Sequence, residues 1–245
     1  MKNPSLSRRY GPPLLSLACF ALTVCLLSGL GRALFSSPSP VSATEQAAPT
    51  VVLDPGHGGE DCGAVGVDGT LEKDLNLQIA QRLRSLLTAC GVTVVMTREE
   101  DVLLYDPSSD YRGQKKVQDL ANRRRIAEQH ENAIFVSIHM NAFPDAKYKG
   151  LQVYYSQNHP DSRTLAEGIQ RGTKTHLQPE NNRKIKPSGS SIYLLEKLHC
   201  PAVLIECGFL SHPEECARLS DENNQQALAL IIGIAILENL SPDGT

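Results

Sequence analysis

Two histidines and two glutamates occupy positions at which the chain could build a catalytic site. His57, His139 and Glu206 each follow a short apolar run that predicts a buried strand, and Glu72 begins a segment with helical periodicity. Strand ends are where α/β folds build their sites. Two neutral imidazoles and one carboxylate can hold zinc and leave its fourth position for water, while a second carboxylate can move protons. These residue types and their positions indicate a candidate His/Glu metal site in an α/β domain, but they do not say which glutamate has which role.

The stretch from Val51 to Gly66, VVLDPGHGGEDCGAVG, determines how His57 would be presented. Its apolar start predicts a strand, and the glycines and proline around His57 break that strand into a loop. Glycine lets the backbone turn sharply and leaves an imidazole open to a metal or substrate. A glycine-rich turn with an incidental histidine is an equally good interpretation of this stretch alone. A phosphate-binding loop is disfavoured, because both the GxGxxG order and the GK[ST] ending are missing.

Glu72 lies in the first turn of the predicted helix, whose apolar residues recur at helical spacing. A carboxylate at a helix start interacts favourably with the positive end of the helix dipole, and for an isolated acidic residue this is the simpler explanation. A glutamate held rigidly there could also serve as a metal ligand beside a strand-end histidine.

Four separated motifs resemble the zinc-dependent N-acetylmuramoyl-L-alanine amidases of the Amidase_3 type, over about residues 50–240. Within that family the resemblance is strongest to the spore-cortex amidases. The motifs occur in the order LDPGHGG, LEKDLNLQIA, SIHMNA and LIECGFLSHPEE.

The resemblance implies one Zn²⁺ per chain, held by His57, Glu72 and His139, with Glu206 as the catalytic carboxylate. It also implies cleavage of the bond between N-acetylmuramic acid and L-alanine in peptidoglycan, in the setting of spore-cortex maturation. Two alternatives are a zinc carboxypeptidase acting on wall peptides and a catalytically silent wall-binding protein. The silent protein would be expected to lack one of the four site residues, and all four are present.

Three further polar residues are candidates for substrate contacts. Arg98 and Arg123 could each bind a peptide carboxylate, although a structural ion pair is the favoured explanation for both. Asn141, two residues after His139, is equally consistent with loop support and with substrate contact. The other five histidines lie in predicted helix ends or polar loops, and we expect them at the surface.

Strands and helices alternate along the chain, which predicts an α/β domain with a mixed, mostly parallel twisted sheet and helices on both faces. Between His139 and Glu206 the sequence predicts no spare amphipathic helix of the kind that blocks the zinc in some relatives, which favours control by expression, by the form of the substrate or by an external partner over built-in occlusion. The expected strands are 51–53, 92–97, 133–138, 151–155 and 202–205, and the expected helices are 72–90, 117–129, 165–177 and 223–240.

The N-terminal 34 residues combine a basic start with a long apolar run, as a cleaved signal peptide or a membrane anchor does. Residues 35–49 are rich in Ser, Pro and Ala and predict a flexible linker. A single catalytic domain is then expected over 50–241. This order predicts an exported enzyme that is either anchored to the membrane or released toward the cell wall.

Composition narrows the remaining possibilities. A formal charge of −3 argues against a nucleic-acid binder that relies on bulk positive charge. Tryptophan is absent, so any sugar recognition would use Tyr, Phe or polar groups. Five cysteines follow the N-terminal segment without a CxxC pair, which gives little support to a thiolate zinc site and leaves at least one thiol without an intramolecular partner. Cys207, beside Glu206, is expected to be a small apolar filler rather than a nucleophile.

Overall fold

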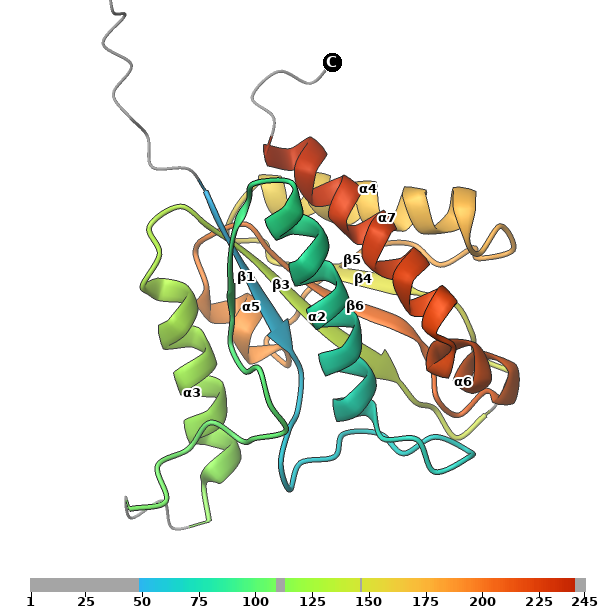
Figure 1. The fold of residues 1–245 in the computed structure, drawn as a ribbon, viewed down its shortest axis with the longest axis horizontal. Helices are drawn as coiled ribbons and strands as arrows, with labels where there is room; N and C mark the ends of the chain where they lie inside the picture. The colour runs from blue at the N-terminus through green and yellow to red at the C-terminus, as the bar shows by residue number, and fades with distance from the viewer. Residues whose placement is uncertain (1–48, 109–112, 146, 241–245) are drawn as a thin grey trace, which may run out of the picture. The chain divides into compact units, whose positions relative to one another are not determined.

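A six-stranded sheet in the order β2-β1-β3-β6-β4-β5 forms the centre of the molecule (Figure 1). The computed structural model describes residues 49–108, 113–145 and 147–240. β1 pairs in parallel with β2 and β3, and β3 pairs in parallel with β6. β4 runs antiparallel to β6 and parallel to β5. The predicted mixed, mostly parallel α/β sheet is confirmed.

Twelve elements make up the described part of the chain. The strands are β1 (Thr50–Pro55), β2 (Thr93–Met96), β3 (Ala133–Asn141), β4 (Gln152–Tyr155), β5 (Lys186–Pro187) and β6 (Ala202–Phe209). The helices are α2 (Glu72–Ala89), α3 (Lys115–Glu128), α4 (Asp161–His176), α5 (Tyr193–Lys197), α6 (Pro213–Ser220) and α7 (Glu222–Leu240).

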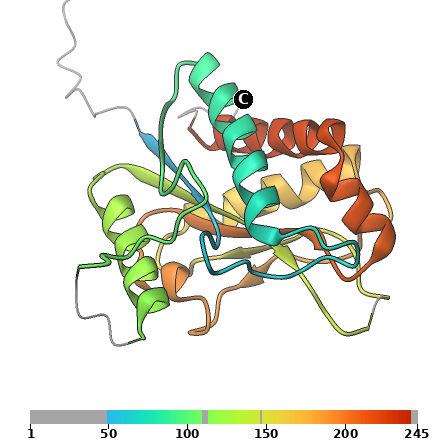
Figure 2. The ribbon, with the colours of Figure 1, turned by 60° about the horizontal axis from the view of Figure 1, so that its bottom comes forward.

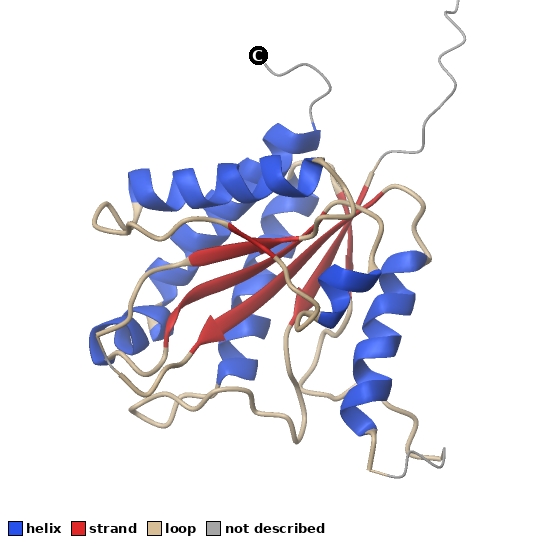
Figure 3. Cartoon of the chain, turned by 180° about the vertical axis from the view of Figure 1, so that it is seen from behind, coloured by secondary structure: helices blue, strands red, loops and turns tan. Residues whose placement is uncertain are grey.

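Helices cover both faces of the sheet, but not equally. α2, α4 and α7 pack on one face and enclose the larger apolar core, which includes Leu53, Ile138 and Ile205. α3 and the short α5 lie on the other face over a smaller core around Val52 and Phe135. Figure 3 shows this second face, where α3 and α5 leave the strands beyond α5 without a covering helix. Adjacent residues of a strand point to opposite faces, so each buried strand supplies both cores.

The parallel strands β1, β3 and β6 all end at one edge of the sheet, where the loop after β1 and the start of α2 also lie. Figure 2 brings this edge forward. The carboxyl ends of neighbouring parallel strands therefore place residues distant in sequence next to one another.

Several elements differ from the sequence-based expectations. β3 and β6 run on to Asn141 and Phe209, so His139 and Glu206 lie inside these strands rather than after them. α4 begins at Asp161, four residues before its apolar periodicity starts, and α6 was not predicted at all. α6 follows the proline in the SHPEE sequence: His212 is its N-cap and accepts from the backbone N–H of Glu215, with proline at the first helical position.

The predicted N-terminal segment and nearly all of the predicted linker lie outside the described residues. Among the helices of the described part, none is long and apolar enough to cross a membrane. The five cysteines at positions 62, 90, 200, 207 and 216 are all free.

Candidate metal centre and active site

His57, Glu72 and His139 converge at the carboxyl edge of the sheet. Glu72 Oε1 lies 3.2 Å from His57 Nε2 and 3.0 Å from His139 Nδ1. One ligand atom from each of the three side chains lies within 4.8 Å of the others, and no second group of this kind occurs in the described ranges. The histidine side chains keep 16% and 19% of their surface exposed, against 4% for Glu72. The glutamate therefore lies on the buried side of the cluster, and the two imidazoles lie on the side that is open to solvent.

Backbone amides fix the carboxylate of Glu72. Oε2 accepts from the N–H of Ala64 at 2.7 Å, and Oε1 accepts from the N–H of Met140 at 3.0 Å. Burial raises the pKa of Glu72, but hydrogen bonds and charge from His139 and His57 outweigh it and hold the pKa well below its usual range. Glu72 is therefore ionised and rigid before any ligand arrives, which suits a metal ligand better than a proton carrier.

His57 adopts a backbone conformation that side chains rarely take. Its φ is +62°, the only positive value for a non-glycine residue in the described part of the chain. Arg123 donates to its carbonyl oxygen at 2.6 Å, and Asp61 Oδ2 lies 3.0 Å from its Nδ1. Burial lowers the pKa of His57, but Glu72 and Asp61 outweigh burial and raise it. An acidic partner at Nδ1 favours the tautomer that leaves Nε2 facing Glu72 free for a metal.

Glu206 stands beside the cluster without belonging to it. On the neighbouring strands β3 and β6, His139 and Glu206 are directly paired, so their side chains share one face of the sheet. Glu206 Oε2 is buried and has no hydrogen-bond partner among the described residues. Burial raises the pKa of this carboxyl group; His139 opposes the shift and Glu72 adds to it. The surroundings thus shift the pKa values of the two glutamates in opposite directions, which is how enzymes give two similar carboxyl groups different roles.

The family assignment agrees with this geometry. The family model described as N-acetylmuramoyl-L-alanine amidase matches residues 51–238. The chain belongs to this amidase family. The match covers all four site residues and nearly all of the described part of the amidase, so the family prediction made from the four motifs is confirmed.

Individual relatives agree in both sequence and fold. The amidase is 36% identical over 194 residues to the germination-specific N-acetylmuramoyl-L-alanine amidase of Bacillus subtilis, spanning 79% of this chain and 81% of that protein. It is similar to the CwlD amidase from Clostridioides difficile, solved in complex with the GerS lipoprotein, with 44% identity, a TM-score of 0.75 and coverage of 79% and 99%. AmiC2 of Nostoc punctiforme is similar at 32% identity and a TM-score of 0.67, with coverage of 78% and 96%.

The amidase buries the two arginines that the sequence offered as substrate contacts. Arg98 donates to the carbonyl oxygens of Pro55 at 2.9 Å and Gly56 at 3.0 Å. Arg123 is 1% exposed and binds Asp54 and Asp119, each at 2.8 Å. Both guanidinium groups are directed at the protein itself, beneath the loop that carries His57. The structural explanation therefore fits both arginines, and neither presents a free donor to a substrate carboxylate.

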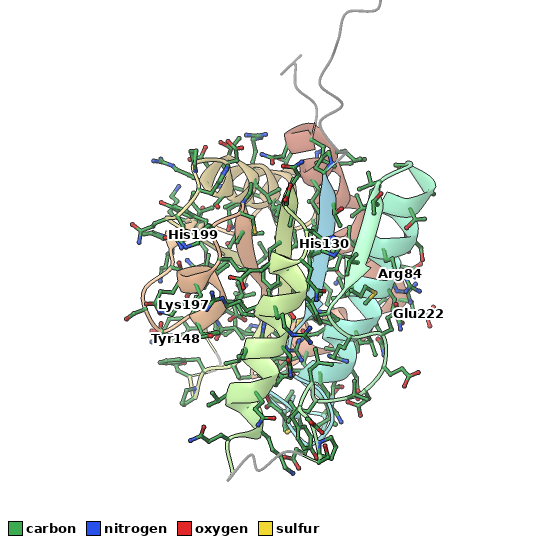
Figure 4. All side chains as sticks on the ribbon, turned by 90° about the vertical axis from the view of Figure 1, so that its left-hand side faces the viewer. Arg84, His130, Tyr148, Lys197, His199 and Glu222 are labelled. Carbon is green, nitrogen blue, oxygen red and sulfur yellow. The ribbon has the colours of Figure 1, made fainter. Side chains whose placement is uncertain are left out.

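The remaining sequence candidates lie around the cluster or away from it. Asn141 is half-buried at the end of β3 and lines an open groove beside Glu206. Cys207 packs in the larger core on the opposite face of β6, and burial raises the pKa of its thiol. The other histidines are half-buried or exposed; Figure 4 shows His130 and His199 nearer the beginning of β1 than Tyr148, away from the carboxyl edge.

The absence of a side chain at Gly56 leaves space for the imidazole of His139, which gives a test of the metal site. A Cβ built on Gly56 would overlap the ring of His139. Gly56→Ala should therefore displace this imidazole and weaken metal binding by about 10- to 100-fold, the range seen when residues around metal ligands are altered. Metal titration of the purified variant measures this. Gly189→Ala, where a Cβ meets nothing within 4 Å, should bind metal as the wild type does.

Proposed function

We propose that this amidase is zinc-dependent and hydrolyses the bond between N-acetylmuramic acid and L-alanine in peptidoglycan, with a role in spore-cortex maturation. The observation that carries the proposal is the cluster of His57, Glu72 and His139 beside Glu206, whose Oε2 atom is buried and has no hydrogen-bond partner among the described residues. Two imidazoles and one carboxylate form a ligand set found in catalytic zinc hydrolases. Iron oxygenases can use the same ligand types, and membership of an amidase family favours zinc.

The four residues divide into two roles in the proposed reaction: three hold the metal ion and one transfers a proton. His57, Glu72 and His139 would hold the ion and leave their open side to the substrate. Zn²⁺ bound there would lower the pKa of water and would polarise the carbonyl group of the bond that is cleaved. Glu206 takes a proton from the attacking water and returns it to the nitrogen of L-alanine, which leaves as an amine. Its raised pKa favours this return step.

The proposed setting is outside the cytoplasmic membrane. The basic and apolar N-terminal segment supports export, with the enzyme anchored or released. Similarity to the germination-specific amidase of Bacillus subtilis and to CwlD supports the cortex role. Because CwlD was solved with the GerS lipoprotein, an accessory protein is part of the proposal, although its identity is left open.

Product analysis distinguishes the amidase from a carboxypeptidase acting on the same material. The full chain, loaded with zinc, should release intact stem peptides that begin with L-alanine, as detected by mass spectrometry of digested peptidoglycan. Shortened peptides still attached to the glycan would instead identify a carboxypeptidase and overturn the proposal.

Metal analysis tests the ligand set separately. His139→Ala should lose most of its bound zinc and remain folded, because the imidazole lies at the exposed edge of the sheet. His176→Ala removes an exposed histidine at the end of α4 and should retain zinc. Full zinc occupancy in purified His139→Ala would exclude this residue as a ligand.

A further inference from the structure

An open groove of about 450 Å³ runs along the uncovered part of the sheet next to Glu206. Its lining residues include members of β3, β4, β5 and β6. Figure 3 shows the face of the sheet that α3 and α5 only partly cover. Aromatic and amide side chains form much of the lining of the groove: Asn141, Phe143, Tyr148, Gln152, Tyr154 and Phe209, together with the cations Arg183 and Lys186.

The groove lies close to the proposed catalytic carboxylate, because one of its lining residues is paired with Glu206. Gln152 on β4 pairs directly with Glu206 on β6, so both side chains point to the same face. Tyr154, two residues along β4, shares that face, and its pKa is raised by burial and by the negative charge of Glu206. A substrate held at Glu206 could therefore extend across β4 toward β5 without leaving this face.

In the part of the chain that the structure describes, two cations of the groove form no ion pair. Arg183 donates to Gln152 at 2.6 Å, and its guanidinium lies 4.9 Å from the centre of the Phe209 ring. Arg183 Nε is buried and has no hydrogen-bond acceptor among the described residues. Lys186 Nζ lies 5.9 Å from the centre of the Tyr154 ring. Within the described ranges, no carboxylate approaches either cation within 4.0 Å.

On the other side of the cluster, by contrast, the cations are already neutralised. Lys115 pairs with Glu60 at 2.9 Å, and Lys116 pairs with Asp61 at 2.7 Å. These two lysines therefore offer less positive charge to a ligand than the two cations of the groove do. Arg183 is also held in place by an amide and an aromatic face, so binding an anion would cost little additional side-chain entropy.

We propose that Arg183 and Lys186 form a subsite that binds carboxylate groups of the stem peptide, so that the groove holds the peptide side of the substrate. A guanidinium with an unpaired N–H is suited to a planar carboxylate, and a lysine on an open strand can adjust to a second one. The rings of Phe143 and Tyr148 pack edge to face with their centres 4.7 Å apart, and they offer the peptide chain an apolar surface. This inference rests on the proposed amidase function and names how that function selects its substrate.

Two matched ligands test the subsite: a muramyl tripeptide with free carboxylates and the same compound with those carboxylates converted to amides. Binding is measured by calorimetry on the zinc-loaded full chain, using the two tripeptides without the muramyl group. Hydrolysis is measured with the two complete muramyl compounds. Arg183→Gln and Lys186→Gln should each weaken binding of the carboxylate form by about tenfold or more, as expected for loss of a charge-assisted hydrogen bond. Lys184→Gln removes an exposed lysine that does not line the groove and should have no effect.

The amidated ligand separates charge recognition from general damage. Wild type should bind it more weakly than the carboxylate form, and the two groove variants should bind it as wild type does. Equal binding of both ligands by wild type, or equal losses for both ligands in the variants, would overturn the subsite. Charge-dependent binding of the tripeptide without hydrolysis of the muramyl compound would support the subsite and contradict the amidase function.

Discussion

Glu206→Gln is expected to retain zinc and substrate binding and to lose activity by the roughly 10²–10⁴-fold typical of a removed acid or base. Glutamine keeps the size of the side chain but cannot accept a proton. Glu206 lies outside the three-residue ligand cluster, so metal content should be unchanged. The uncharged amide should also be tolerated, because burial raises the pKa of Glu206 and so disfavours a charged side chain at this position. Zinc content and the rate of peptide release, measured across a zinc titration, provide the test.

Glu72→Gln is the matched comparison, because it makes the same chemical change at the other glutamate. A neutral oxygen replaces the charged one that lies between His57 and His139, so zinc affinity itself should fall. Excess zinc should restore part of the activity of Glu72→Gln and none of the activity of Glu206→Gln. If Glu206→Gln is the variant that loses metal and recovers with added zinc, the two roles are reversed.

The fold and the clustering of His57, Glu72 and His139 could be predicted from local patterns, whereas the role given to each residue came from the resemblance of the four motifs. Short apolar runs marked β1, β3 and β6, and helical spacing marked α2 from its first residue. Once parallel pairing is assumed, strand ends meet at one edge, which brings His57, Glu72 and His139 together. The boundaries were less accurate where tertiary pairing extends an element: β3 and β6 continue past their apolar runs because each hydrogen-bonds to the other.

Residues whose contacts depend on loop conformation or on strand pairing could not be found from the sequence. Asp61 sits four positions after His57 in a loop, and nothing in its neighbourhood predicts a bond to the imidazole. Arg183 lies in a polar stretch that predicts only a loop, and its place beside Glu206 follows from the pairing of β4 with β6. Arg123 and Asp54 are 69 residues apart in the sequence, so only the folded structure shows that the guanidinium of Arg123 points toward Asp54.

The buried ion pairs of Arg123 should dominate the stability of this edge of the sheet. Replacing Arg123 with Met leaves the carboxylates of Asp54 and Asp119, which are 1% and 2% exposed, without the cation that pairs with them. Such a change typically costs about 3–5 kcal/mol in the free energy of unfolding. Urea unfolding in the presence of a chelator measures this without a contribution from bound metal. Arg124→Met removes the same charge from an exposed pair with Glu128 and should leave the unfolding midpoint unchanged.

The pH dependence should identify Asp54 as the carboxylate that needs Arg123. In wild type, burial raises the pKa of Asp54, but the charge of Arg123 and hydrogen bonds from Ser137, Arg123 and Thr97 outweigh it and lower the pKa. Its stabilising contribution is therefore present above the ordinary value of 3.8 and is lost as the pH falls through the lower, folded value. In Arg123→Met the charge and the hydrogen bond of the arginine are gone, and only the hydrogen bonds from Ser137 and Thr97 still oppose burial, so the pKa of Asp54 should rise and the folded variant should take up a proton at a higher pH than folded wild type. The gap in stability between the two proteins should narrow as the pH falls from 7 toward about 4, and Asp54→Asn in the Arg123→Met background should recover part of the loss at pH 7. A gap that stays constant with pH, or a double variant no more stable than Arg123→Met, would show that Asp54 does not depend on this arginine.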